Sequence, residues 1–92
     1  MTNSLRTAMS GVAYYRIRVS GGVSEWWVSQ YMNVKTLETH HGAGFFVTEI
    51  TGRVTDQDAL IGLLNMLYDM RHVLISVDQL TAEQYDEIAA EG

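Results

Sequence analysis

The segment from Thr55 to about Arg71 constrains the fold more than any other part of the sequence. Thr55 is a predicted N-cap, acidic or amide side chains follow it in the first turn, and Asp58 occupies the capping-box position. Apolar side chains then recur at intervals of three and four residues, and two more widen the stripe: Leu60, Leu63, Leu64, Leu67 and Met70, with Ile61 and Tyr68. A helix with so broad an apolar face packs against something flat, and a β-sheet is the support that we expect.

Four stretches are predicted to be strands, and the sequence marks them with unequal clarity. Residues 13–19 show the two-residue alternation of a half-buried strand. The inner face of that strand is predicted to carry Ala13, Tyr15, Ile17 and Val19. Residues 45–54 are rich in Phe, Val, Ile and Thr, whereas residues 34–40 are β-branched and polar with poor alternation. Residues 73–77 are almost continuously apolar, which is typical of a strand that is central or buried from both sides.

Glycines and capping residues mark the connections between these elements. Gly42 and Gly44 lie between two predicted strands, where a hairpin needs positive φ values. Ser24 can cap a short helix, one face of which is predicted to carry Val23, Trp26, Trp27 and Tyr31. Thr81 and Gln84 have the spacing of a capping box at the start of an acidic helix.

The order of elements predicts an α+β fold. Strand, helix, strand, strand, helix and strand form the β-α-β-β-α-β order of a ferredoxin-like sandwich, in which both helices cover one sheet face and the other face is bare. We divide the chain into a flexible arm (residues 1–11), a single α+β domain (12–80) and an acidic helical tail (81–92). The tail helix is expected over residues 82–90.

Composition narrows the classes of function. Among the 92 residues, 47% are apolar and only 18% are charged, so we expect some apolar surface to remain exposed or to meet a partner. The net charge of -5 disfavours binding to nucleic acid, which depends on Lys and Arg. The absence of cysteine excludes disulfides and thiol chemistry. Without an apolar stretch long enough for a signal peptide or a membrane span, we expect a cytoplasmic protein.

One stretch resembles a known family. Residues 15–19 read Tyr-x-Ile-x-Val, residues 51–64 contain Asp-Gln-x-Ala-Leu-x-Gly-Leu-Leu, and residues 74–77 read Leu-Ile-Ser-Val. This pattern is similar to a family of short, uncharacterised bacterial proteins, and the resemblance implies no assigned activity, cofactor or catalytic residue. The residues of the central motif have structural explanations, since Asp56 favours a helix N-terminus and Gly62 allows a neighbour to approach the helix.

Histidines and a short glycine-aromatic motif raise two alternatives. His40, His41 and His72 suggest a metal site, but adjacent residues on a strand point to opposite faces, so we expect neither a metal nor another cofactor. We interpret His72 as stabilising the C-terminus of the long helix. The run from His41 to Val47 resembles part of the third-strand signature of RNA-recognition motifs, which keeps RNA binding as a third functional hypothesis.

Adjacent tryptophans offer a further candidate site. Trp26 and Trp27 are about 100° apart on a helix, so at most one can be central in the core. We interpret the pair as large residues that reinforce a small core, with a ligand cradle as the alternative.

The bare sheet face is where we expect function. It is predicted to present aromatic and apolar surface, as interfaces do. The candidate residues for an interface or ligand face are Tyr14, Arg16, Arg18, Trp26, Trp27, His40, Phe45 and Val47. No catalytic residue is predicted. The first hypothesis is a non-catalytic module that self-associates, with a dimer as the first expectation, and serves as a small subunit of a bacterial assembly.

A second hypothesis is a small dimeric α+β-barrel enzyme or ligand binder. In this alternative the cleft between sheet and helices holds an aromatic or polyketide-like molecule against Trp26, Trp27, Tyr14 and His40, an idea that rests on fold analogy. The acidic tail either caps a sheet edge or docks on a protein partner.

Overall fold

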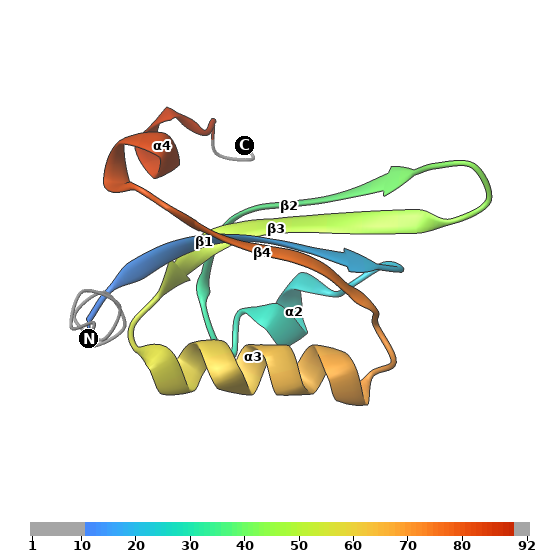
Figure 1. The fold of residues 1–92 in the computed structure, drawn as a ribbon, viewed down its shortest axis with the longest axis horizontal. Coiled ribbons are helices and arrows are strands. Elements are labelled where there is room, and N and C mark those ends of the chain that lie inside the picture. Colours follow the sequence, from blue (N-terminus) through green and yellow to red (C-terminus); the bar gives the residue numbers. More distant parts are fainter. Residues whose placement is uncertain (1–10, 90–92) are drawn as a thin grey trace.

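The protein is an α+β domain built on a four-stranded antiparallel sheet (Figure 1). A computed structural model describes residues 11–89. Its strands are β1 (Ala13–Ser20), β2 (Asn33–His41), β3 (Phe46–Val54) and β4 (Leu74–Leu80). They lie in the order β2-β3-β1-β4, and each neighbouring pair is antiparallel.

Strand β1 lies in the middle of the sheet and follows the predicted alternation. Its inner positions Ala13, Tyr15, Ile17 and Val19 are all buried. Since Ile17 pairs with Ile50 of β3 on one side and Val77 of β4 on the other, an apolar row crosses three strands. This row is the floor on which the helices pack.

The long helix is α3 (Gln57–Asp69), and it lies against this floor. The predicted N-cap is wrong by one residue, because the side chain of Asp56, and not of Thr55, accepts a 2.8 Å hydrogen bond from the Ala59 amide. The buried stripe consists of Leu60, Leu63 and Leu67. The predicted width is also wrong: Ile61, Tyr68 and Met70 are exposed, because a single helix on a flat sheet buries only its central stripe.

The short helix α2 (Glu25–Val28) is a single turn. Ser24 caps it as predicted, through a hydrogen bond of 3.3 Å from the Trp26 amide. The predicted apolar face is wrong for the tryptophans, since Val28 is fully buried while Trp26 and Trp27 are 63% and 44% exposed. Positions 26 and 28 are about 200° apart on a helix, so burying one turns the other to solvent.

Two glycines are required by close packing. A Cβ on Gly62 of α3 would lie 2.9 Å from the Tyr31 ring, which confirms that the helix is approached there. A Cβ on Gly52 of β3 would lie 2.6 Å from the carbonyl oxygen of Asn33. The start of β2 can approach β3 this closely only because residue 52 is a glycine. In the hairpin, Gly44 has a positive φ (87°) and Gly42 does not, so one of the two glycines that could supply it does so.

Strand β4 differs most from its prediction. It lies at the end of the strand order as an edge strand, and not in the centre. Its first half is exposed, with Leu74 and Ile75 at 48% and 51% and the preceding Val73 at 66%. A continuous apolar run has the same appearance in the sequence whether it is buried or on an uncovered edge.

The last helix, α4 (Ala82–Glu87), lies across the sheet from α2 and α3 (Figure 1). The predicted capping box of Thr81 and Gln84 is present. The helix is shorter than predicted because it ends at Glu87, with Ile88 as its C-cap. The face expected to be bare is thus partly covered. The predicted N-terminal arm, apart from Gly11, lies outside the described residues.

Candidate functional site: a charged sheet face and an apolar groove

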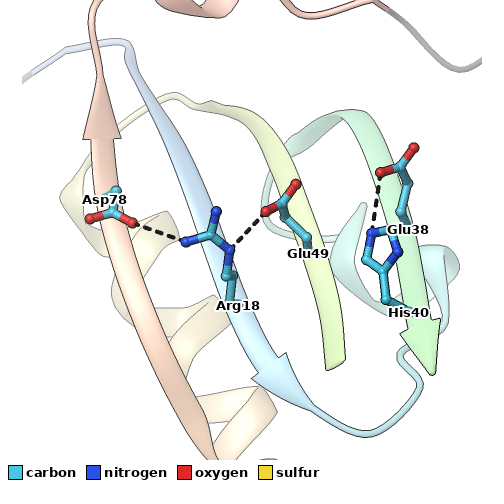
Figure 2. Close-up of polar contacts among 5 residues, drawn as sticks. All are labelled: Arg18, Glu38, His40, Glu49 and Asp78. Carbon is cyan, nitrogen blue, oxygen red and sulfur yellow. Dashed lines mark hydrogen bonds and ion pairs between the residues drawn. The ribbon is translucent and has the colours of Figure 1, made fainter. Parts of the chain in front are cut away.

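The sheet face opposite α2 and α3, here called the open face, carries an ionic row. Arg18 of β1 lies between acidic residues of both neighbouring strands (Figure 2). Its Nε donates to the Glu49 carboxylate at 2.7 Å, and its Nη1 lies 3.9 Å from the Asp78 carboxylate. The side chains of all three residues are between a quarter and three fifths exposed, so water screens the pairs. Such a row holds the three strands in register.

A second polar pair continues the row onto β2. The register places Glu38 directly opposite Glu49, so two carboxylates are cross-strand neighbours. Like charges in this arrangement repel. His40 lies beside this pair, with its Nε2 3.5 Å from the Glu38 carboxylate (Figure 2).

The other end of the open face is covered by Tyr85 of α4. Its ring stacks on Tyr14 of β1 with centroids 4.4 Å apart. The Lys35 ammonium donates to the Tyr85 carbonyl at 2.6 Å and also lies 4.4 Å from the ring centre. Burial raises the pKa of the Tyr85 hydroxyl, while nearby Arg53 acts in the opposite direction. An aromatic stack and one lysine therefore hold α4 on the sheet.

The prediction of an apolar open face is wrong. Of the predicted site residues, Tyr14, Arg16, Arg18, His40 and Val47 do lie on this face, as the strand register shows. Their surroundings are charged, and Arg16 has a buried Nε without a hydrogen-bond partner among the described residues.

Apolar surface gathers instead beside the β4 edge. A half-open groove of about 870 Å³ lies between the C-terminal half of α3 and the start of β4. We call this the α3–β4 groove. Its lining residues are Leu64, Leu67, Tyr68, Asp69, Arg71, His72, Val73 and Leu74. Tyr68 is 78% exposed and Val73 66% exposed, so its apolar wall is open to solvent.

The remaining predicted site residues lie apart from both surfaces. Trp26 and Trp27 contact each other edge to face at 4.8 Å on α2. Phe45 lies in the β2–β3 turn, with its ring over Gly42. Hence the cleft imagined against Trp26, Trp27, Tyr14 and His40 does not form, because these residues belong to opposite sides of the sheet.

The three histidines are not brought together. His40 lies on the open face opposite Val47, while His41 pairs with Phe46 on the other face and contacts its ring at 4.7 Å. His72 lies at the end of α3, where its backbone amide donates to the Leu67 carbonyl at 3.0 Å. Its side chain acts elsewhere, because its Nδ1 lies 2.6 Å from the Ser20 carbonyl oxygen and ties β1 to the β4 entrance. In the part of the chain that the structure describes, no three metal-ligating side chains form a group.

Sequence reasoning missed the groove because its residues belong to two elements that were each predicted to be buried. One signal was available: Ile61, Leu64 and Tyr68 extend the α3 stripe to a width that exceeds what one sheet contact can cover. An excess of apolar residues on one flank predicts that part of the stripe stays exposed in the folded chain.

Fold and surfaces together define a small α+β domain with a charged sheet face on one side and an apolar groove on the other. The chain belongs to the family described as a domain of unknown function (DUF8691), whose sequence profile matches residues 14–78. The predicted membership of an uncharacterised family is thereby confirmed. No curated protein and no solved structure matches the chain. No helix within residues 11–89 is long and apolar enough to cross a membrane.

Proposed function

We propose that this protein is a non-catalytic interaction module that self-associates through the α3–β4 groove and serves as a small subunit of a bacterial cytoplasmic assembly. The observation that carries the proposal is the exposed apolar wall formed by Tyr68, Val73 and Leu74 beside an edge strand. Burying apolar surface of this kind against a partner removes it from water and so favours association.

The proposed scaffold is a ferredoxin-like sandwich. The strand order β2-β3-β1-β4 and the position of α2 and α3 on one face support it. In such a sandwich two helices of full length cover the sheet, whereas α2 here has four residues. The short α2 leaves α3 as the main cover, which accounts for apolar surface that the chain does not bury by itself.

Light scattering coupled to size-exclusion chromatography tests the proposal. We expect the wild-type protein to be larger than a monomer, and a Tyr68→Ser, Leu74→Ser double variant to be monomeric. Trp26→Ser is the matched control, because it removes an aromatic side chain of similar exposure on α2 and is expected to leave the assembly unchanged. A wild-type monomer that retains no protein in a pull-down would contradict the proposal.

The groove also supports the alternative of a ligand binder. Its 870 Å³ volume and its Tyr68 and His72 side chains suit an aromatic molecule with a polar substituent. A thermal-shift screen of aromatic acids and phenols distinguishes the two functions. A ligand whose stabilisation is lost in Leu74→Ser, in a protein that is monomeric throughout, would favour this alternative. RNA binding has less support, because the open-face positions of β3 are Val47, Glu49, Thr51 and Arg53, none of them aromatic.

A further inference from the structure

We propose that the polar end of the α3–β4 groove binds an α-amino acid with a large apolar side chain. Three side chains at the end of α3 supply the polar groups, and all three line the groove: Asp69, Arg71 and His72. The inference deepens the proposed function, because it concerns the same groove, and it rests on that function only for the effect of the ligand on assembly. Every residue that contacts the ligand belongs to one copy of the chain.

The backbone at the end of α3 holds Arg71 in an unusual conformation. The Arg71 amide donates to the Tyr68 carbonyl at 2.9 Å, and the His72 amide donates to the Leu67 carbonyl at 3.0 Å, which is the pairing of a Schellman motif. In this motif the residue after the C-cap has a positive φ, which glycine adopts without strain, yet Arg71 occupies the position with a φ of 69°. Strained backbone is characteristic of binding sites. Here it places a guanidinium, and not a glycine, beside the groove.

Both charged side chains at this end are free to meet a ligand. Within residues 11–89, neither Asp69 nor Arg71 forms an ion pair, although only one residue separates them, and both are exposed. A carboxylate of the ligand meets a cation in Arg71, which can donate two parallel hydrogen bonds to it. An ammonium meets an anion in Asp69, and the negative end of the α3 dipole favours the same positive charge.

His72 adds a hydrogen-bond acceptor to the groove. Its Nδ1 lies 2.6 Å from the Ser20 carbonyl oxygen, which can only accept, so Nδ1 carries the hydrogen. In the neutral ring Nε2 is then an acceptor, and it has no partner among the described residues. The ring fits closely against Gly21, where a Cβ would lie 3.1 Å from Nδ1. Two acceptors and one guanidinium thus match an ammonium and a carboxylate.

The apolar part of the groove accommodates the side chain of the ligand. Leu64, Leu67 and Leu74 line it, and its volume of about 870 Å³ has room for a phenyl or branched alkyl group. Removing such a group from water contributes binding free energy that exposed ion pairs do not supply alone. The groove therefore distinguishes large apolar amino acids from small or charged ones.

A titration with three probes separates these contributions. The probes are L-phenylalanine, hydrocinnamate, which lacks the ammonium, and phenethylamine, which lacks the carboxylate. Binding is measured by NMR on the full chain, with shifts expected at Leu64, His72 and Leu74. We expect phenylalanine to bind most tightly and each truncated probe to bind about fivefold more weakly, the effect of losing one exposed ion pair.

Charge-removing variants assign each contact. Arg71→Gln is expected to weaken phenylalanine binding about fivefold and to leave phenethylamine unchanged. Asp69→Asn is expected to weaken phenylalanine and phenethylamine and to leave hydrocinnamate unchanged. Arg53→Gln is the matched control, because it removes an exposed arginine from the open face and should change none of them. No binding at millimolar phenylalanine, or equal affinity in Arg71→Gln and the wild type, would overturn the inference.

Light scattering separates this inference from the proposed function. In a dimeric protein, phenylalanine is expected to raise the monomer fraction, because it occupies the apolar wall that the copies share. A monomer at all concentrations that binds phenylalanine through Arg71 would overturn self-association and leave the binding site standing. A dimer that binds no phenylalanine would overturn the binding site and leave the proposed function standing.

Discussion

The two faces of the sheet differ in the chemistry of the side chains that they expose. On the open face, charged residues pair across three strands and Tyr85 of α4 covers one end. On the helix side, the centre is packed tightly but the flank beside β4 remains apolar and exposed. The comparison teaches that the charged side chains of the open face contact one another within the chain, whereas part of the apolar surface on the helix side stays exposed.

The largest expected effect is on the free energy of unfolding, and it distinguishes a core position from a groove position. Leu63 and Leu64 are adjacent on α3, but Leu63 is fully buried and Leu64 lines the groove. We expect Leu63→Ala to lower the free energy of unfolding by about 3 kcal/mol, because it leaves a cavity that the sheet cannot fill. Leu64→Ala is expected to cost about 1 kcal/mol in the monomer. Urea denaturation followed by circular dichroism measures both, and equal losses would mean that the groove is part of the core.

An alkaline titration tests the packing on the helix side, where a buried tyrosine and an exposed one can be compared. Burial raises the pKa of the Tyr15 hydroxyl above its usual value of 10.0 on the helix side. The unfolded chain therefore ionises first, so the stability that neutral Tyr15 provides is complete below pH 10 and is lost as the pH rises through the higher folded-state pKa.

Tyr15→Phe should reduce this alkaline loss of stability. The measurement is the change in urea midpoint between about pH 8 and about pH 11. Tyr68→Phe is the control, because it removes the hydroxyl of a side chain that is 78% exposed. This variant is expected to show the same slope as the wild-type protein. Identical slopes in all three proteins would show that the Tyr15 hydroxyl is no more desolvated than an exposed one.

The sequence predicted what is repeated along an element better than what depends on neighbouring elements. Alternation in β1 and the central α3 stripe are intrinsic to those segments, and both are buried as expected. The edge position of β4 depends on strand order, and the exposure of Trp26 depends on which side of a single turn meets the core. Neither is encoded in local periodicity.

The same distinction applies to the candidate site. Tyr14, Arg16 and Arg18 were placed on one face correctly, because a strand alternates. The ion pairs of Arg18 with Glu49 and Asp78 depend on the register of three strands, which a single segment does not determine. The position of α4 on this face follows from a Tyr14–Tyr85 contact across 71 residues of sequence, which no local pattern indicates.

A smaller effect tests how firmly α4 is held on the open face. Tyr85→Ala removes the stack on Tyr14 and the cation–π contact of Lys35. We expect a loss of about 1 kcal/mol, since each contact contributes about 0.5–1 kcal/mol when partly exposed. The oligomeric state should not change, because α4 and the groove lie on opposite sides of the sheet. Dissociation of the assembly in this variant would show that the open face takes part in it.

The smallest expected effects have opposite signs at two facing glutamates. Glu49 accepts the 2.7 Å hydrogen bond from Arg18, so Glu49→Gln should destabilise the protein by about 0.5 kcal/mol. Glu38 lies opposite Glu49 and has only a 3.5 Å contact with His40, so Glu38→Gln should relieve repulsion and stabilise by about 0.3 kcal/mol. Both differences should shrink in high salt, which screens exposed charges. Urea midpoints at low and high ionic strength measure them. If Glu38→Gln destabilised the protein as much as Glu49→Gln, the His40 contact would outweigh the repulsion, and the whole ionic row would act as a single network.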